Sequence, residues 1–282
     1  MNIGCHVSLA KGIDSAPKEA SDLGCEAMQF FTRSPHGGPV PEIAEETAKS
    51  FKANCKKFKI KNSYVHAPYL INFASSNNRV YYGSISSIKT ELARASLLGV
   101  KYVMTHLGSA KDLGEKESLE KTIEGLKKVF DGYTGKAKLL IENSAGAGQI
   151  IGSDFKQVSK TLSAMSGVAV MAGACLDTQH SFASGYDWKN KFDESLQKID
   201  KSLGLENIKL IHANDSLTEL DSRVDRHAHI GKGKIGLDGF KNLVKFAEER
   251  NIDMICETNY PGVAKDVEIL KDLRKKLKIK KF

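Results

Sequence analysis

The sequence predicts an α/β fold, a (β/α)8 TIM barrel that forms one domain over residues 1–282. Eight short apolar segments recur along the chain, and their first residues are 24 to 45 positions apart. This spacing is too wide for hairpins and fits parallel strands that are joined by helical crossovers. The segments are apolar on both faces, as strands covered on both sides must be. Eight such units within this length match the size of a barrel.

The eight expected strands follow one another in chain order and are rich in β-branched and aromatic residues. They span residues 2–8, 26–32, 62–67, 101–107, 137–143, 169–177, 207–215 and 252–258. Longer polar insertions follow strands five and seven, at 144–156 and 215–236. Because barrels build their active sites from the loops after the strands, these insertions are expected on the functional face.

Segments with helical periodicity separate the expected strands. The clearest span residues 43–58, 86–99, 116–130, 192–204 and 237–250. Gly99 and Gly204 end two of them, where a left-handed C-cap fits. A doubly wound open sheet is the alternative fold, but no GxGxxG follows the first strand, and we therefore favour the barrel.

The composition, with 41% hydrophobic and 27% charged residues, is that of an ordinary globular protein. No apolar run approaches the ~20 residues that span a bilayer. The first ten residues lack the pattern of a secretory signal, and the five cysteines have no CxxC spacing. We therefore expect reduced thiols and a monomer in the cytoplasm, or in the nucleus of a cell that has one, with no membrane partner.

The net charge of +8 favours a polyanionic partner such as nucleic acid. Part of this charge lies in a basic C-terminal tail, KDLRKKLKIKKF (271–282). The alternative interpretation of the tail is a solvated helix end.

Side chains that bind metals end six consecutive strands, from the third to the eighth. They are His66, His106, Glu142, Asp177, His212 and Glu257. His180 follows Asp177 by three residues, and Asp225 and His227 lie two residues apart after strand seven. One such His is usually a hydrogen-bonded residue of the core or the rim. Here five of the eight His belong to the set, and a barrel brings its strand ends to one mouth.

Four carboxylates in one mouth would repel one another unless cations neutralise them. Imidazole and carboxylate ligands without thiolates suit Zn²⁺, and Mn²⁺ or Fe²⁺ are possible substitutes. Nine side chains, at three or four for each ion, predict two to three ions if one carboxylate is shared. Neighbouring ions of this kind serve phosphate-ester hydrolysis by activating a hydroxide and holding the phosphoryl oxygens. In a basic protein, a nucleic-acid phosphodiester is the substrate that fits.

The motifs around these residues resemble the endonuclease IV family of apurinic/apyrimidinic (AP) endonucleases. They are HAPYLIN (66–72), THLGS (105–109), IENSAGAG (141–148), CLDTQHSFASGYD (175–187), HANDS (212–216), SRVDRHAHIGKGKIG (222–236) and CETNYP (256–261). The resemblance covers essentially the whole chain. It implies a zinc-dependent enzyme of DNA base excision repair that cleaves duplex DNA 5′ to an abasic site, through a zinc-activated hydroxide, and leaves a 3′-hydroxyl.

The resemblance also implies three zinc ions in each chain. His66, His106 and Glu142 would bind the first, and Glu142 would bridge to a second that Asp177, His212 and Glu257 complete. The third would be held by His180, Asp225 and His227. Glu142, Asp177 and Glu257 are the carboxylates to which we assign catalytic roles.

Several residues are candidates for DNA contact. Tyr69 stands where the family places a Tyr against the lesion, with a rim aromatic as the alternative. Basic residues flank the third ligand set and fill the Gly-rich loop after it, with a solvated surface as the alternative: Arg223, Arg226, Lys232 and Lys234. Lys232 and Lys234 could approach a phosphate closely, because the neighbouring glycines expose backbone N–H groups.

The loop after strand two departs from the family. It reads FTRSPHGG, with His36 where an Arg is common and Gly38 where a Trp is common. In the family this pair wedges into the duplex as the abasic nucleotide flips out, and unstacking costs free energy. We therefore expect weaker distortion of the DNA or another wedge, with Arg33 and Tyr69 as the candidates.

Two other functions compete with the nuclease. A metal-dependent sugar isomerase or epimerase on a similar barrel also gathers His and carboxylates, but it needs only one or two ions. The extra set of His180, Asp225 and His227 and the positive charge argue against it. A nucleic-acid-binding barrel without catalysis is a further alternative, and the complete ligand set argues against that.

Overall fold

The computed structural model describes residues 1–279, and its centre is a closed barrel of eight parallel strands, as predicted. The strands follow the ring in the order β1-β10-β7-β6-β5-β4-β3-β2. Their bounds are β1 Ile3–His6, β2 Ala27–Phe30, β3 Asn62–His66, β4 Tyr102–Thr105, β5 Lys138–Glu142, β6 Met171–Asp177, β7 Ile208–His212 and β10 Asp253–Cys256. Each lies within the segment expected for it, and only the ends are shorter.

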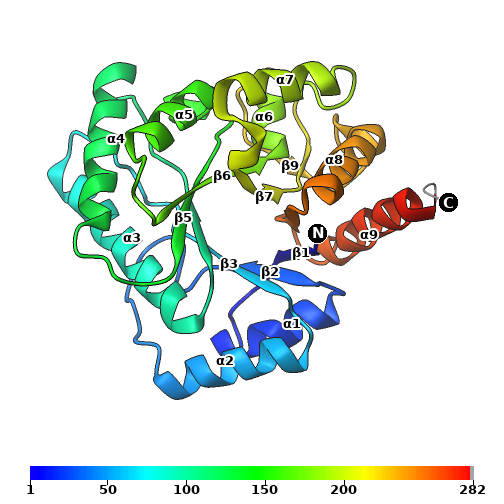
Figure 1. Cartoon of the computed structure of the whole chain (residues 1–282), viewed down its shortest axis with the longest axis horizontal. Coiled ribbons are helices and arrows are strands. Elements are labelled where there is room, and N and C mark those ends of the chain that lie inside the picture. Colours follow the sequence, from blue (N-terminus) through cyan, green and yellow to red (C-terminus); the bar gives the residue numbers. More distant parts are fainter. Residues whose placement is uncertain (280–282) are drawn as a thin grey trace.

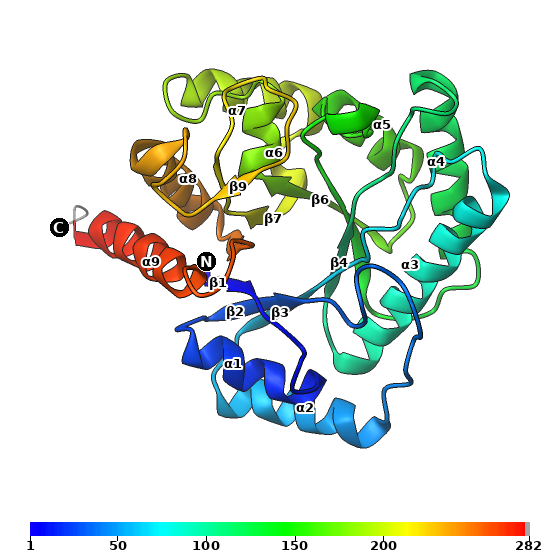
Figure 2. The same ribbon diagram turned by 180° about the vertical axis from the view of Figure 1, so that it is seen from behind.

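Helices surround the barrel as an outer ring (Figures 1 and 2). They are α1 Ala16–Asp22, α2 Glu45–Lys57, α3 Asn78–Leu98, α4 Glu115–Phe130, α5 Phe155–Ala164, α6 Thr178–Ala183, α7 Phe192–Leu203, α8 Gly236–Arg250 and α9 Val263–Ile279. Short 3-10 turns lie at Ile13–Ser15, Ala147–Gln149 and Leu205–Asn207. No helix in the described part of the chain is long and apolar enough to cross a membrane.

Two of the expected helix boundaries need correction. α3 begins at Asn78, eight residues earlier than periodicity indicates, because the Asn77 side chain caps it by accepting the N–H groups of Arg79 and Val80. Gly99 caps the other end in the left-handed region, as predicted. Gly204 does not, since its φ of 79° is combined with a ψ of 123°.

The barrel interior is filled by one small layer of side chains. Seven strands contribute one residue each: Ala27, Tyr64, Met104, Leu140, Cys175, Leu210 and Ile255. β1 contributes Gly4 at the same level, beside Ala27 and Ile255. A Cβ at Gly4 would lie 1.6 Å from the Ala27 carbonyl oxygen, and only glycine therefore fits there. This closed interior leaves the mouth of the barrel for polar side chains.

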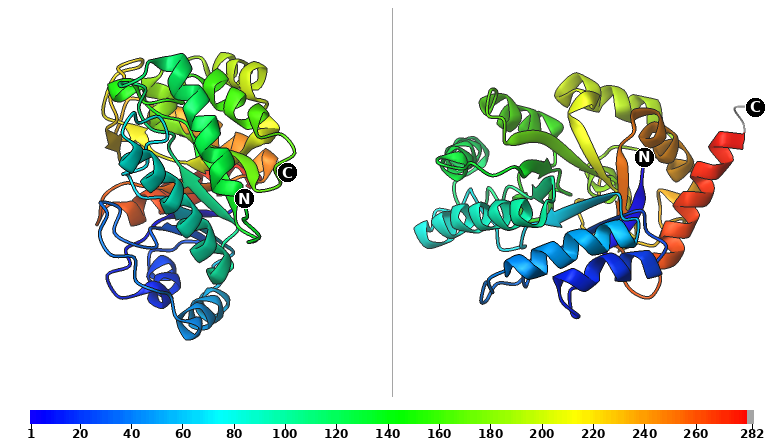
Figure 3. Two further views of the ribbon diagram at one scale, coloured as in Figure 1. Left: turned by 90° about the vertical axis from the view of Figure 1, so that its left-hand side faces the viewer. Right: turned by 60° about the horizontal axis from the view of Figure 1, so that its bottom comes forward.

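The insertion after β7 folds back over that mouth. Its strands β8, Asp215–Ser216, and β9, His227–Ala228, pair in antiparallel fashion. The insertion after β5 contains the 3-10 turn at Ala147–Gln149. Figure 3 shows the barrel from two further directions, with helices on its outside. Of the basic tail, 271–279 belong to α9 and 280–282 lie outside the described residues.

Candidate metal centre

A cleft of about 800 Å³ opens at the C-terminal mouth of the barrel. The predicted metal ligands reach it because β3, β5, β6 and β7 end at His66, Glu142, Asp177 and His212. The other strands of this series, β4 and β10, place theirs at the next residue, as for Glu257 after Cys256. The structure brings all six strand-end side chains together, as parallel strands of a barrel must.

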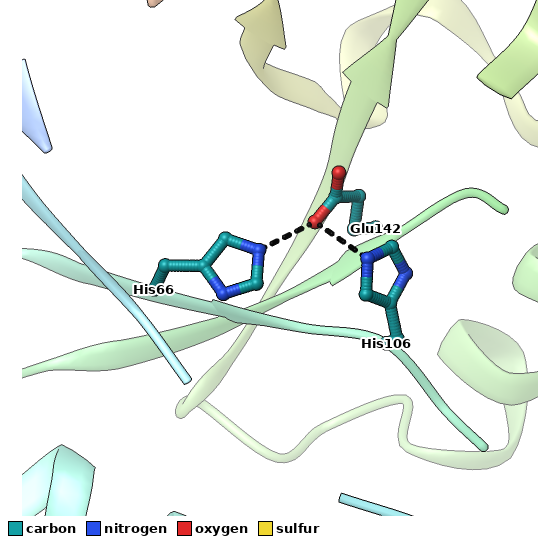
Figure 4. Close-up of side chains that lie close together, drawn as sticks. All are labelled: His66, His106 and Glu142. Carbon is teal, nitrogen blue, oxygen red and sulfur yellow. Dashed lines mark hydrogen bonds and ion pairs between the residues drawn. The ribbon is translucent and has the colours of Figure 1, made fainter. Parts of the chain in front are cut away.

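The first group contains His66, His106 and Glu142 (Figure 4). Both rings point their Nε2 atoms at one carboxylate oxygen. Glu142 Oε2 lies 3.1 Å from the Nε2 of His66 and 3.5 Å from that of His106. All three residues come from neighbouring strands, β3 to β5, so the spacing of this group is set by the sheet itself.

The second group shares Glu142 with the first and adds Asp177, His212 and Glu257. His212 Nδ1 lies 2.9 Å from Glu142 Oε1 and 3.2 Å from Glu257 Oε2. In each group the possible ligand atoms all lie within 4.8 Å of one another. This is the arrangement expected of a bridging carboxylate.

The third group contains Asp177, His180 and His227. This group differs in part from the expected set, because it contains Asp177, which also belongs to the second group. Asp225 is half exposed, yet its carboxylate lies 3.3 Å from the Nε2 atoms of both His180 and His227. The centre therefore has two shared carboxylates, Glu142 and Asp177, at its junctions.

The charges of the centre call for cations. Burial disfavours a charged Glu142, but His106, His212 and His66 outweigh this effect and hold the pKa of its carboxyl well below the usual range. Burial likewise opposes the charged form of His180, but Asp177, Asp225 and Glu142 raise its pKa to about 10. Buried carboxylates thus force protons onto imidazoles, and bound metal ions would supply the same positive charge.

The donor atoms fit such ions. His227 Nε2 is buried and forms no hydrogen bond with any residue from 1 to 279, although it faces two carboxylates. The three groups contain only imidazole and carboxylate donors. Cys175 lies beneath them, where burial raises the pKa of its thiol to about 12, and it remains a neutral thiol. The set suits zinc and the related divalent ions.

Gln29 of β2 organises this centre, and the sequence analysis did not single it out. The side chain is fully buried, and its Nε2 donates to Glu257 Oε1 at 2.6 Å. Its Oε1 lies 2.7 Å from His212 Nε2, which leaves the Nδ1 of that ring for the centre. One lone amide in the apolar segment EAMQFFT was the signal that could have revealed it.

Two asparagines support the carboxylates in a similar way. Asn214 Nδ2 donates to Asp177 and Glu257, at 2.7 and 3.1 Å. Asn143 accepts the backbone N–H of Asp177 through its side-chain oxygen. Such partners fix the orientation of metal-binding groups.

Two residues expected to contact DNA near loop 31–38, Tyr69 and Arg33, differ in their exposure. Tyr69 is 61% exposed at the edge of the cleft, and its ring lies 5.2 Å from that of Phe31 and 5.8 Å from that of His36. Arg33 points the other way: its guanidinium is buried against Glu91, with Nε 2.9 Å from Oε1. Arg33 thus anchors the loop and does not project from the surface as a wedge must.

The basic residues of the β7 insertion also separate into two sets. Arg226 and Lys232 line the cleft. Arg223 stands on the rim beside Asp221, and Lys234 pairs with Glu219 away from the cleft. The backbone N–H groups of Gly231, Gly233, Ile235 and Gly236 all donate to the Asp215 carboxylate. These amides are occupied by Asp215 and are not free to contact a phosphate, whereas the approach of Lys232 and Lys234 to a phosphate stays a prediction.

Comparisons with known proteins agree with this geometry. The family model described as "Xylose isomerase-like TIM barrel" matches residues 17–279. A protein of Cenarchaeum symbiosum named "Probable endonuclease 4" is 37% identical over 97% of this chain and 99% of its own. Another of that name, from Aquifex aeolicus, is 41% identical over 86% of both chains.

Among solved structures, endonuclease IV from Thermus thermophilus superposes with a TM-score of 0.86, at 29% identity over 98% of this chain and 100% of its own. A D-tagatose 3-epimerase-like protein has the same fold at 20% identity and a TM-score of 0.75. The second likeness concerns the fold alone. From the near-complete match to the endonuclease 4 proteins and the three linked ligand groups, we conclude that the chain belongs to the endonuclease IV family of xylose isomerase-like TIM barrels.

Proposed function

We propose that the chain is a metal-dependent DNA repair endonuclease that hydrolyses the phosphodiester 5′ to abasic sites in duplex DNA and leaves a 3′-hydroxyl. The observation that carries this proposal is the set of three linked ligand groups in one cleft, with Tyr69 and basic side chains at its edge. The relatives' name, endonuclease 4, supports DNA as the substrate.

Three zinc ions in each chain are part of the proposal, with Mn²⁺ or Fe²⁺ as possible substitutes. His66, His106 and Glu142 would hold the first, and Glu142, Asp177, His212 and Glu257 the second. His180, His227 and Asp225 would hold the third, with Asp177 beside them. When bound, such ions activate water and neutralise charge on a phosphodiester.

The protein's own residues position the metal-binding groups and exclude water from the centre. Glu142 and Asp177 are fully buried and shared between groups, and they fix the distances within the centre. Gln29 and Asn214 hold Glu257 from two sides and orient its carboxylate. We assign catalytic roles to these three carboxylates because each belongs to the ligand group that would hold the second ion.

DNA recognition is assigned to the edge of the cleft. Tyr69 offers a ring on which an exposed base or sugar can stack. His36 lies beside it, and Arg226 and Lys232 supply positive charge across the cleft. With Arg33 buried, Tyr69 is the better candidate of the two for the missing wedge. We further infer a monomer in the cytoplasm, in keeping with the five free cysteines.

The test uses a labelled duplex that carries one synthetic abasic site. We expect nicking directly 5′ to the lesion, loss of nicking with a chelator, and recovery when zinc is restored. A polymerase should extend the product, because only a 3′-hydroxyl can be extended. An undamaged duplex is the control, and a protein that leaves the lesion intact with all three metals bound would refute the proposal.

A sugar isomerase or epimerase is the second candidate, since proteins with those activities share this fold. Metal content separates the two functions. About three ions in each chain support the nuclease, whereas one or two, with turnover of a ketose, would favour the isomerase.

A further inference from the structure

A second basic depression lies on the outer wall of the barrel, between α5 and α7. These helices pack against each other in the helical ring (Figure 1). The depression has a volume of about 710 Å³, and we call it the α5–α7 groove. Five cationic side chains line it, against a single carboxylate: Lys156, Lys160, Lys198, Lys201, Arg223 and Asp154. Arg223 pairs with Asp221, so the four lysines and Asp154 leave a local excess of three charges, which is large for a chain with a net charge of +8.

The four lysines of the α5–α7 groove have no acidic partners. Several exposed helical lysines elsewhere pair with acids one turn away, as Lys18 does with Asp22 and Lys241 with Asp238. Within residues 1–279, none of the four groove lysines forms an ion pair. Unmatched charges of one sign along a surface are the usual electrostatic footprint of a polyanion site.

Nearby acids cannot neutralise these lysines because they are engaged elsewhere. Asp154 caps α5 by accepting the N–H of Lys156. Glu194 of α7 pairs with Lys191, and Asp200 accepts the N–H of Leu205. α5 itself contains no acidic residue. The positive charge of the groove therefore comes from α5 and from the face of α7 that carries Lys198 and Lys201, because the acids of α7 do not line the groove.

The shape of the groove suits an extended ligand. Lys156 and Lys160 stand one turn apart on α5, and Lys198 and Lys201 do so on α7. All four side chains are exposed, and Tyr186, packed on Phe155 with ring centroids 5.1 Å apart, forms a neutral floor. Mobile ammonium groups along two helices match a chain of phosphates better than one compact anion.

Arg223 of the α5–α7 groove belongs to the same loop as Asp225 and Arg226, which line the metal cleft. The backbone N–H of this residue donates to the Ala183 carbonyl at the end of α6, and its Nη1 lies 3.5 Å from Ser153 Oγ. Two residues later, Asp225 touches His180 of the metal centre. Arg223 thus lines the groove two residues before a side chain of the metal centre.

We propose that the α5–α7 groove binds the phosphate backbone of duplex DNA beyond the lesion, an inference that rests on the proposed function for where the DNA enters. If a duplex lies over the cleft, the part of it on one side of the lesion would lie along Arg223 and the four lysines. The contacts would be independent of sequence, because phosphates carry no sequence information. They would add affinity for long duplexes and leave the chemistry at the metal centre unchanged.

The test compares two quadruple variants with the same change in charge. The groove variant carries K156Q, K160Q, K198Q and K201Q. The control variant carries K18Q, K241Q, K245Q and K265Q, all exposed lysines that pair with acids away from the groove. Affinity is measured over a range of salt, for abasic-analogue duplexes of about 10 and about 30 base pairs, or one and three helical turns.

On the long duplex we expect the groove variant to bind roughly tenfold more weakly than the control variant. The slope of log K against log salt should be less steep for the groove variant than for the control variant, by about 2 to 3. Each phosphate contact contributes about 0.9 to the magnitude of this slope. On the short duplex the two variants should bind alike and nick at the same rate. Equal affinity of both variants for the long duplex at every salt concentration would overturn the proposal.

An undamaged 30-base-pair duplex makes the two proposals separable, because phosphate contacts do not depend on the lesion. If the parent protein fails to nick abasic DNA while the groove variant alone loses affinity for long DNA, only the proposed function fails. If nicking is normal and the two variants bind alike, only the groove is refuted.

Discussion

At the scale of single residues, the centre depends on side chains that never face the substrate. Gln29 touches Glu257 and His212, and Asn214 touches Asp177 and Glu257. Each amide uses its donor on a carboxylate, and Gln29 also uses its acceptor on an imidazole. A ligand set drawn from six strands is held in register by such cross-links, because each strand by itself leaves its terminal side chain free to rotate.

Replacing Gln29 with Met keeps the volume of the side chain and removes these hydrogen bonds. We expect metal content to fall and nicking to slow by roughly 10- to 100-fold, as is usual when partners of metal ligands are lost. Metal is measured by elemental analysis of the purified protein, and nicking with the abasic duplex. Exposed Gln197 changed to Met is the control. Full metal content with full activity would show that Gln29 has no positioning role.

Tyr69 carries the clearest prediction for DNA recognition. Its side chain is 61% exposed, so Tyr69→Ala should change the free energy of unfolding by no more than about 0.5 kcal/mol. Loss of a stacking ring should weaken binding of an abasic duplex by about 1–3 kcal/mol, or about 5- to 150-fold. Binding is measured by fluorescence anisotropy.

Tyr82 offers a matched control for this experiment, because it is 56% exposed on α3 and does not line the cleft. Tyr82→Ala should leave binding unchanged. If both Tyr variants bind as the parent does, Tyr69 is a rim aromatic, and either the DNA is distorted less or another residue is the wedge.

At the scale of elements, strands could be predicted far better than the loops after them. Buried parallel strands can be recognised in the sequence as apolar runs, and all eight strands lie where expected. The ligands followed, because strand ends in a barrel converge. The GKGKIG loop could not be predicted in this way. Its glycines wrap the Asp215 carboxylate, 16 to 21 positions away, and pattern alone does not distinguish an internal anion from an external phosphate.

The orientation of side chains in loops could not be predicted from the sequence either. Arg33 and Tyr69 were equivalent candidates for a wedge, yet one is buried and the other exposed. The difference arises from Glu91 in the middle of α3, a long-range partner 58 positions away. A buried acid within a helix attracts whichever cation can reach it, and no local pattern predicts which.

One further element-scale contact ties α9 to the start of β2. Both Nη atoms of Arg274 donate to Glu26, each at 2.7 Å. Burial raises the pKa of the Glu26 carboxyl, but Arg274 and the N–H of Ile3 outweigh it, and the net pKa is lowered. This residue of the basic tail therefore serves the fold and is not a free solvated charge.

This contact predicts a pH-dependent stability. Arg274→Ala should lower the free energy of unfolding by about 2 kcal/mol at pH 7, as for hydrogen bonds between charged groups. Because the folded-state pKa of Glu26 is depressed, its contribution is present above the unfolded value of about 4.3 and disappears as the pH falls through the folded value. The difference between parent and variant should therefore shrink below about pH 4.3. It is measured by urea denaturation, with exposed Lys275→Ala as control, and a difference that is constant down to pH 3 would contradict this account.

At the scale of the whole molecule, acidic side chains gather at the mouth of the barrel, and basic side chains predominate over the rest of the chain. The mouth holds four carboxylates, whereas the chain as a whole carries +8. Polyanionic DNA is drawn to the basic exterior, and the acidic centre would repel it unless cations are bound there. The same ions should therefore matter for substrate binding, for chemistry and for the stability of the fold, since each ligand group joins segments that lie far apart in sequence.

Metal removal tests this coupling. A ligand that binds only the folded state stabilises it by about 4 kcal/mol at 1,000 times its dissociation constant. For a chain of this size, each kcal/mol raises Tm by about 2–4 °C, so zinc returned to chelator-treated protein should raise Tm by roughly 10 °C. Glu142→Gln, which alters the carboxylate shared by two groups, should reduce the shift, and Mg²⁺ in place of zinc should give a small one. The measurement is a thermal melt followed by circular dichroism. An identical Tm with and without zinc in the parent protein would mean that the ligand groups do not act as a metal centre, because linked binding must stabilise the state that binds.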